Sequence, residues 1–283
     1  MTLQPELAGL VLIAAISHAL WNAFVKTSGE RTFTMAVVLL GPAAAGVVLV
    51  LAFPVPARES WLYLGLGTLL HTVYYACLLA AYRVGDLSHV YPLARGVAPL
   101  IVAGGAFLFA GEALSPLGIA GVLLASFGIM SLTLERGLPR GDGVAPVGYA
   151  LLTGLCIASY TVVDGIGVRK SGEVLAYIGW LNILKPLPIL TWVAARRGRE
   201  FVRYTITHWR FGLTGGVFNL LAYTLVLYAL AYGAMAHVTA LRETSVIFAA
   251  AIGAIALQEG FGRRRILAAA MVAGGVTLLL AVG

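Results

Sequence analysis

Long apolar runs separated by short polar connections cover the chain. The runs are continuously apolar and do not alternate with polar residues, so they predict helices rather than the strands of a membrane barrel. Crossing about 30 Å of hydrocarbon takes roughly 20 helical residues, and a helix satisfies its backbone hydrogen bonds internally. We therefore predict an all-α, polytopic membrane protein with ten transmembrane helices, over residues 6–25, 33–53, 60–81, 88–109, 115–134, 145–167, 175–195, 210–230, 236–257 and 266–282.

The two halves of the chain resemble each other at polar and glycine positions. Gly85 and Gly233 lie 148 residues apart, as do His71 and Asn219. The same or a slightly shorter spacing relates Tyr75/Tyr223, His89/His237, Arg95/Arg242, Glu112/Glu259, Gly128/Gly275, Asn22/Asp164 and Pro42/Pro186. We predict two related five-helix repeats, residues 1–140 and 141–283, joined near Gly141-Asp142-Gly143. Chance similarity between apolar segments is the alternative.

An odd number of spans in each half fixes the relative orientation of the two predicted repeats. Two related five-span units in one chain insert in opposite directions across the membrane. Such inverted repeats are typical of secondary transporters, whose substrate site lies near the membrane midplane between the repeats. The repeat pattern therefore predicts a central binding site rather than a peripheral one.

Composition agrees with a membrane location. Hydrophobic residues make up 60% of the chain and charged residues only 11%, whereas soluble domains are about one quarter charged. The net charge of +7 comes from residues in short connections, which favours lipid headgroups rather than nucleic acid as partners. Cys77 and Cys156 each lie within an apolar run, so we predict no disulfide framework, no metal site and no cofactor.

Basic residues gather in the connections that follow odd-numbered spans. These connections carry Lys26, Arg31, Arg83, Arg136, Arg140, Arg196, Arg197, Arg199, Arg203, Arg210, Arg263, Arg264 and Arg265. The even-numbered connections carry Arg58, Arg169 and Lys170. Ten spans place both termini on one side, and the positive-inside rule predicts that this side is outside the cytoplasm.

Five charged residues fall deep inside the predicted spans: Arg95, Asp164, Lys185, Arg242 and Glu243. A charge in hydrocarbon costs a few kcal/mol or more, so each is a candidate functional residue. The alternative is that the two arginines only neutralise the acidic residues and fix helix packing. Because buried ion pairs contribute little net stability, we favour a role in substrate binding.

Further polar residues occur in pairs spaced i, i+4, which places both members on one helix face. The pairs are His18/Asn22, His71/Tyr75, Tyr160/Asp164 and Asn219/Tyr223. The repeat alignment relates the first pair to the third and the second to the fourth. The four polar faces therefore predict one central cavity, with these residues among its substrate-binding groups. The alternative is that each is an ordinary polar residue of the core, with its hydrogen bonds made to neighbouring helices.

Prolines are expected to interrupt two of the predicted spans. Pro92 and Pro99 lie in the fourth span, and Pro186 and Pro188 lie in the seventh. Proline removes a backbone hydrogen bond and kinks a helix, which frees carbonyl groups near Arg95 and Lys185. These carbonyls are further candidates for contact with substrate, and a packing kink is the alternative. We expect Gly212 and Gly216 to allow close helix packing, and Glu112 and Glu259 to complement the starts of the helices that follow them.

Several stretches resemble the EamA family of the drug/metabolite transporter superfamily. They are Trp21-Asn22 with Lys26, the run Gly85-Asp86-Leu87-Ser88-His89-Val90-Tyr91-Pro92-Leu93-Ala94-Arg95-Gly96, and Gly111-Glu112-Ala113-Leu114 with Gly118, Gly121 and Gly128. The resemblance implies a ten-span, YddG-like exporter of amino acids, other metabolites or drugs, and it implies cytoplasmic termini. Tyr91 joins the candidate substrate-binding residues. The second half departs from the pattern, because Leu241-Arg242-Glu243 stands where the first half has Leu93-Ala94-Arg95.

Enzyme motifs are not found: the chain has no His-Glu-x-x-His, P-loop or Gly-x-Ser-x-Gly sequence. We predict a secondary active exporter of small polar metabolites, amino acids foremost, in a bacterial inner membrane. The expected partners are a small-molecule substrate and membrane lipids, and the expected state is a monomer. The alternatives are an intramembrane enzyme acting on a lipid-linked substrate, a transporter of drugs or organic anions, and a membrane scaffold or sensor.

Overall fold

The fold of the described residues is entirely helical. The computed structural model describes residues 4–27, 30–84, 87–133, 144–256 and 262–281. In chain order the helices are α1 (Pro5–Thr27), α2 (Arg31–Ala52), η1 (Arg58–Ser60), α3 (Trp61–Val84), α4 (Leu87–Ala110), α5 (Pro116–Ser131), α6 (Val144–Arg169), α7 (Val174–Leu184), α8 (Leu187–Thr207), α9 (Trp209–Tyr232), α10 (Met235–Arg242), α11 (Ser245–Ala256) and α12 (Arg263–Ala281). The prediction of an all-α protein is confirmed.

Apolar side chains cover much of the outside of the bundle. Leu51, Leu108 and Phe109 are among the most exposed large side chains, whereas Arg95, Asp164 and Glu243 are buried. A soluble protein has the opposite distribution, because exposing this much apolar surface to water is unfavourable. The bundle is therefore built to be surrounded by lipid, and it is a polytopic membrane protein as predicted.

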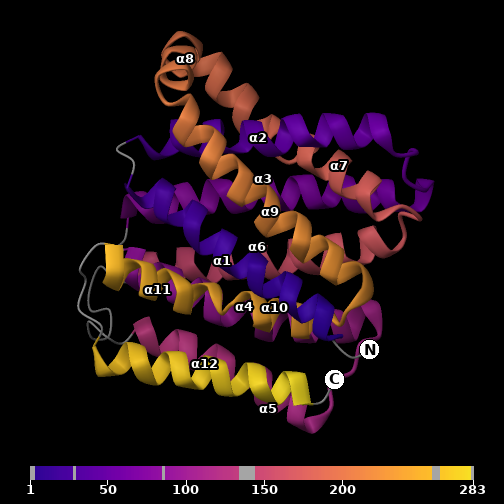
Figure 1. Ribbon diagram of the computed structural model, residues 1–283, viewed down its shortest axis with the longest axis vertical. Helices are drawn as coiled ribbons and strands as arrows, with labels where there is room; N and C mark the ends of the chain where they lie inside the picture. Colours follow the sequence, from indigo (N-terminus) through magenta and orange to yellow (C-terminus); the bar gives the residue numbers. More distant parts are fainter. Residues whose placement is uncertain (1–3, 28–29, 85–86, 134–143, 257–261, 282–283) are drawn as a thin grey trace.

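The helices run back and forth between two ends of the bundle (Figure 1). The N- and C-termini both lie at the right-hand end in this view, together with the turns that join α4 to α5 and α9 to α10. At the left-hand end, α1, α3 and α5 finish and α2, α4 and α6 begin. The exposed residues Arg31, Arg199 and Arg263 belong to helices or helix ends on this left-hand side. The basic connections thus lie opposite the termini.

Two of the predicted spans are each divided into two helices. The seventh span, predicted over 175–195, breaks between α7 and α8 at Lys185-Pro186, as its prolines led us to expect. Its second helix also continues to Thr207, with a non-helical residue at Arg197. The ninth span, predicted over 236–257, breaks at Glu243-Thr244, which the sequence did not predict.

The prediction that Pro92 and Pro99 interrupt the fourth span is wrong. Helix α4 continues from Leu87 to Ala110 with both prolines inside it. A membrane helix accommodates proline where neighbouring helices and side chains compensate for the missing backbone bond. Within this continuous helix the carbonyl groups four residues before each proline still lack a backbone donor, so their contact with substrate stays a prediction.

Within the described residues, eight helical segments are long and apolar enough to cross a membrane by length and composition, with α7 and α8 taken together. The helix α5 has 16 residues, and α10 and α11 have 8 and 12. A ten-span topology requires α5 to cross as a short helix and α10 and α11 to cross together. The count of ten remains a prediction.

Helix packing joins the first part of the chain to the second throughout the bundle. The helix α1 packs against α9, α3 against α6, α2 against α7, and α5 against α12. Glycines allow the closest approaches: a Cβ atom added at Gly121 would lie 2.8 Å from the carbonyl oxygen of Gly275. Close backbone contacts of this kind are typical of membrane helix pairs.

Replacing Gly216 with alanine is expected to destabilise the protein. A Cβ atom there would lie 3.0 Å from the carbonyl oxygen of Val38 and 3.3 Å from Cα of Gly41, on the facing helix α2. Overpacking of this kind costs about 1–3 kcal/mol. The midpoint of thermal unfolding in detergent micelles should fall. The control is Gly65→Ala, where a Cβ atom meets nothing within 4 Å; equal midpoints for the two variants would contradict the close packing of α2 on α9.

Candidate functional site

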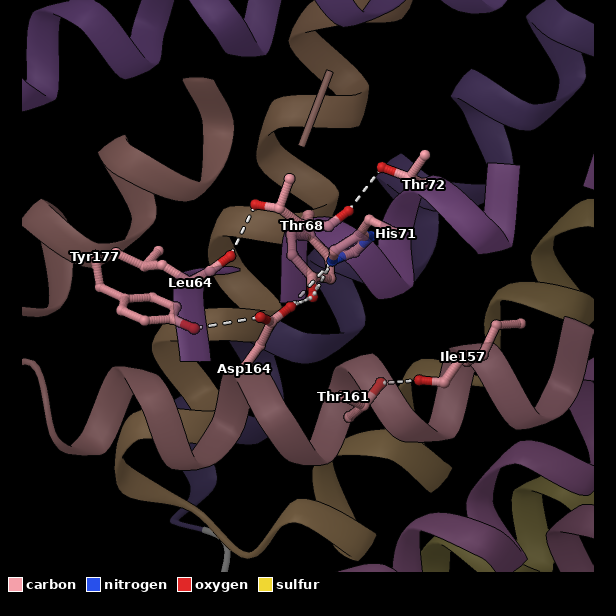
Figure 2. A network of polar contacts seen from close by, with 9 residues as sticks. Leu64, Thr68, His71, Thr72, Ile157, Thr161, Asp164 and Tyr177 are labelled. Carbon is pink, nitrogen blue, oxygen red and sulfur yellow. Dashed lines mark hydrogen bonds and ion pairs between the residues drawn. The ribbon is translucent and has the colours of Figure 1, made fainter. Parts of the chain in front are cut away.

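Asp164 is the centre of a buried hydrogen-bonded cluster. Its carboxylate is 0% exposed and lies on α6 in the middle of the bundle. Tyr223 donates to Oδ2 at 2.5 Å, His71 Nε2 lies 3.0 Å from the same oxygen, and Tyr177 donates to Oδ1 at 3.2 Å. Figure 2 shows His71 and Tyr177 approaching the carboxylate from different helices. Side chains from α3, α6, α7 and α9 thus meet at one group.

The space for this carboxylate comes from a glycine. Gly67 lies one turn before His71 on the same face of α3, and a Cβ atom at Gly67 would lie against Oδ1 of Asp164. The nearby threonine hydroxyl groups contribute nothing to the cluster, because Thr68, Thr72 and Thr161 each donate to a carbonyl group of their own helix (Figure 2). Donors to Asp164 are therefore supplied by the histidine and the tyrosines.

Aromatic rings enclose the Asp164 cluster. The rings of His71 and Tyr160 are stacked with centroids 4.1 Å apart, and Tyr74 meets Tyr160 edge-on at 5.6 Å. Lys185 Nζ lies 4.3 Å from the centroid of the Tyr223 ring. Such rings attract cations through their π faces and also present hydroxyl groups for hydrogen bonding.

A second cluster joins the buried residues Arg95, Arg242 and Glu243. Arg95 Nε lies 2.6 Å from Oε2 of Glu243, and Arg242 Nη2 lies 3.5 Å from Oε1. Both contacts are ion pairs by distance. Arg95 Nη2 also donates to the hydroxyl group of Ser245 at 2.9 Å. The carboxylate of Glu243 is 0% exposed and has a guanidinium group on two sides.

Charges of this second cluster lie at a helix break. Glu243 follows the last residue of α10, and Ser245 begins α11. Lys185 likewise follows the last residue of its helix, α7, and its positive charge there complements the negative end of the helix dipole. Broken helices with buried charges at the break are the form that binding sites take in many secondary transporters.

The structure brings most of the predicted site residues toward these two clusters. The first is formed by His71, Tyr160, Asp164, Lys185 and Tyr223. Tyr75 lies beside it, with its ring tilted to that of His71 and the two centroids 6.4 Å apart. Asn219 lies on the same helix face as Tyr223, and its buried Oδ1 has no hydrogen-bond partner within the described structure. The charges of Arg95 and Arg242 act on Tyr160, which links the two clusters.

The predicted pair on α1 has a different environment. The charges of Arg95 and Arg242 act on His18, so it lies near the second cluster. Trp21 Nε1 donates to His18 Nδ1 at 3.2 Å. The side-chain Nδ2 of Asn22 donates to the carbonyl group of His18 on the same helix at 2.8 Å, so this hydrogen bond does not join Asn22 to either cluster. The side chain of Tyr91 lies outside the described part of the structure.

Some members of the site were missed by sequence reasoning. Tyr177 bonds Asp164 directly, and it lies eight residues before Lys185 on the same helix face, a spacing that the pattern analysis did not use. Ser245 follows Glu243 after the unpredicted break, and Gly67 precedes His71 by one turn. Neither carries charge, so a survey of buried charges overlooks both. No group of three or more metal-ligating side chains is found within the described ranges.

The second half of the chain is similar to a known family of transporters. Residues 145–281 match the model of the EamA-like transporter family, whose members are transporters and not enzymes. This domain therefore implies a membrane transporter of the drug/metabolite type, and it removes the enzyme alternative. No curated protein matches the chain.

Solved structures support the fold over nearly the whole chain. A crystal structure described only as that of a protein aligns with a TM-score of 0.73 at 17% sequence identity, covering 98% of this chain and 96% of the other. In total, 29 chains match. At this identity the likeness extends to the fold alone.

Proposed function

We propose that this chain is a secondary active transporter that exports small polar metabolites, amino acids foremost, by alternating access around the two buried clusters. The observation that carries the proposal is the enclosure of Arg95, Asp164, Lys185, Arg242 and Glu243 inside a bundle whose surface is apolar. Burying charges at membrane depth is costly, and proteins keep such residues where solutes or ions are bound. The match of residues 145–281 to the EamA-like transporter family supports transport as the role of these buried charges.

The proposed mechanism uses two inverted five-helix repeats, residues 1–140 and 141–283. Packing supports it, because equivalent helices of the two halves meet: α5 packs against α12 and α2 against α7. The first helix of each half also packs against the third helix of the other, as α1 against α9 and α3 against α6. A pairing of this kind allows the two halves to rock around a site that stays fixed between them.

The charges of the two clusters favour a substrate that carries both signs. Arg95 and Arg242 outnumber Glu243, so the second cluster has an excess of positive charge that suits a carboxylate. The first cluster presents Asp164 within aromatic rings, which suits an ammonium group. An amino acid carries both groups on one small molecule. An organic anion is the second candidate, because Lys185 adds a further cation near Asp164.

Counterflow in proteoliposomes tests the proposed function. Vesicles preloaded with an unlabelled amino acid should accumulate the same labelled amino acid, and carboxylates without an amino group should exchange more slowly. Empty vesicles and vesicles with heat-denatured protein are the controls. Exchange of organic anions alone would replace amino acids as the substrate class, and no exchange of any polar metabolite would refute the proposal.

The charge distribution predicts that both termini lie outside the cytoplasm. The basic connections lie at the end of the bundle opposite the termini, and positive residues are retained on the cytoplasmic side. Alkaline phosphatase fused after Gly283 should therefore be active, and a fluorescent protein fused there should stay dark. Fusions truncated after Leu132, at the opposite end, serve as the control and should give the reverse pattern. A fluorescent C-terminal fusion would restore the cytoplasmic termini that the family resemblance implies.

A further inference from the structure

A separate cavity lies at the end of the bundle where the termini are found. Its volume is about 200 Å³, and it lies between α4, the segment 111–114 and the start of α10. Its walls are mostly alanines, with Ala103, Ala106 and Ala236 among them. Glu112, Arg169 and His237 supply its charged and polar lining. None of these groups belongs to the two clusters described above.

The cavity lies in line with the Arg95–Glu243 pair along one seam of the bundle. On α4, Arg95, Pro99, Ala103 and Ala106 follow at three- or four-residue steps and share a face. On α10, Ala236 and Ala240 share a face in the same way, and Glu243 follows three residues later, directly after the helix. The two helices pack against each other. The seam from the cavity to the ion pair is thus formed largely by small side chains.

An ion pair forms part of the wall of the cavity. Arg169 Nη1 donates to Oε1 of Glu112 at 2.5 Å, and the same guanidinium group donates to the carbonyl oxygens of Leu230 at 2.8 Å and Gly233 at 2.6 Å. Oε2 of Glu112 accepts from the backbone N–H of Met235 at 2.8 Å. The sequence led us to expect that Glu112 complements the start of α5; instead it complements the start of α10, and Ser115 caps α5. The pair therefore fastens the α4–α5 turn to α6 and to the α9–α10 turn.

A histidine in the wall of the cavity has a buried ring nitrogen without a hydrogen-bond partner among the described residues. His237 is 6% exposed, and its Nδ1 has no hydrogen-bond partner in the described part of the chain. Leaving such an atom unpaired costs about 1–3 kcal/mol, so a cavity of this kind normally holds water or a polar solute. At roughly 30 Å³ for each molecule, 200 Å³ accommodates a few waters or one small metabolite.

We infer that this cavity is the vestibule of the transport pathway, that it passes small polar solutes to and from the Arg95–Glu243 pair, and that the Arg169–Glu112 ion pair is its gate. This inference rests on the proposed function, because a vestibule needs a transported solute. Its volume is below the 300–1,000 Å³ usual for a ligand pocket, which suits passage better than storage. His237 supplies the hydrogen bond that replaces water as a polar solute enters.

Thiol labelling tests the gate without any knowledge of the substrate. Ala106→Cys is made in a chain whose two native cysteines, both buried, are replaced by alanine. Glu112→Gln removes the charge of the gate but keeps the size of the side chain, and it should speed labelling by a membrane-impermeant methanethiosulfonate about tenfold. The control is Ala229→Cys, a buried alanine in the core outside the cavity, whose labelling should not change. Equal labelling rates at Ala106→Cys with and without Glu112→Gln would overturn the gate.

Reversible cross-linking tests the link between the gate and transport. In the same background, Glu112→Cys and Arg169→Cys are joined by a short bifunctional methanethiosulfonate reagent. Counterflow should fall to background when the cross-link forms and return after reduction, and each single-cysteine variant should be insensitive. Full transport through the cross-linked protein would overturn the inference. If the double variant is inactive before cross-linking, the labelling result decides. A wild-type protein that exchanges no metabolite would refute the proposed function and leave the labelling result standing.

Discussion

Replacing Arg95 with alanine is expected to abolish transport while the protein remains folded in detergent. Arg95 forms the closer contact to Glu243, at 2.6 Å against 3.5 Å for Arg242. If Arg95 binds the carboxylate of the substrate, truncating it costs about 2–5 kcal/mol of binding, which corresponds to a loss of roughly thirtyfold or more in affinity. Folding should survive, because Arg242 still neutralises Glu243. Counterflow measures the activity, and the elution profile in detergent measures the fold.

Two further variants separate a role in substrate binding from a role in packing. Arg95→Lys keeps the charge but loses the planar fork, so it should also be impaired if substrate is bound by two parallel hydrogen bonds. The double variant Arg95→Gln with Glu243→Gln removes both charges together. If Arg95 serves only to neutralise Glu243, the double variant should transport normally. We expect it to stay inactive. Arg58→Ala, an exposed arginine at the end where the termini lie, is the control and should have full activity.

The pattern of apolar runs predicted the fold because a segment inserts into a membrane according to its hydrophobicity, and the pattern measures that hydrophobicity directly. A run of about twenty apolar residues has few alternatives to a spanning helix. Prolines were less informative. Pro186 stands at a break, whereas Pro92 and Pro99 lie within a continuous helix. Whether a proline breaks a membrane helix depends on the neighbours that compensate for its missing hydrogen bond, and the local sequence does not contain them.

The buried charges were found from the sequence, but their partners were not. The cost of a charge in hydrocarbon identified Arg95, Asp164 and Glu243 as exceptional residues. We left open that Arg95 neutralises Asp164; in the structure Arg95 pairs with Glu243, and Asp164 bonds His71, Tyr177 and Tyr223. Pairing depends on which helices meet, and helix contacts over long separations are not encoded in any short stretch of sequence.

The break at Glu243-Thr244 shows the same limitation in a single element. Residues 236–257 contain no proline, and the four polar residues from Arg242 to Ser245 were interpreted as buried groups within one span, not as a helix break. Ion pairing with Arg95 and the hydrogen bond from Arg95 to Ser245 hold the backbone on the two sides of the break. A tertiary contact therefore sets the local structure here, and the residues that depart from the helical pattern are the candidate site residues.

Asp164→Asn is expected to remove the coupling of transport to a pH gradient while exchange without a gradient continues. The substitution keeps the size of the side chain. Its one carbonyl oxygen can accept from one of the two tyrosines, and its NH2 group can donate to the phenol oxygen of the other, so the cluster should stay assembled. It removes the group that can gain and lose a proton, and His71 at 3.0 Å provides a path for that proton. We expect accumulation driven by the gradient to fall at least tenfold in proteoliposomes, and counterflow to remain within about twofold of the wild type.

The alternative for Asp164 is that it only balances Lys185, whose charge acts on it from α7. In that case Asp164→Asn would leave Lys185 buried without a counter-charge, and both accumulation and counterflow would fail. Adding Lys185→Met would then restore both activities. If Asp164 carries the coupling proton, the double variant instead keeps exchange and lacks gradient drive. Tyr177→Phe is the control, because it removes one hydrogen bond to the carboxylate but leaves the carboxylate itself. Gradient-driven accumulation in Asp164→Asn at the wild-type level would exclude this residue and make Glu243→Gln the next variant to measure.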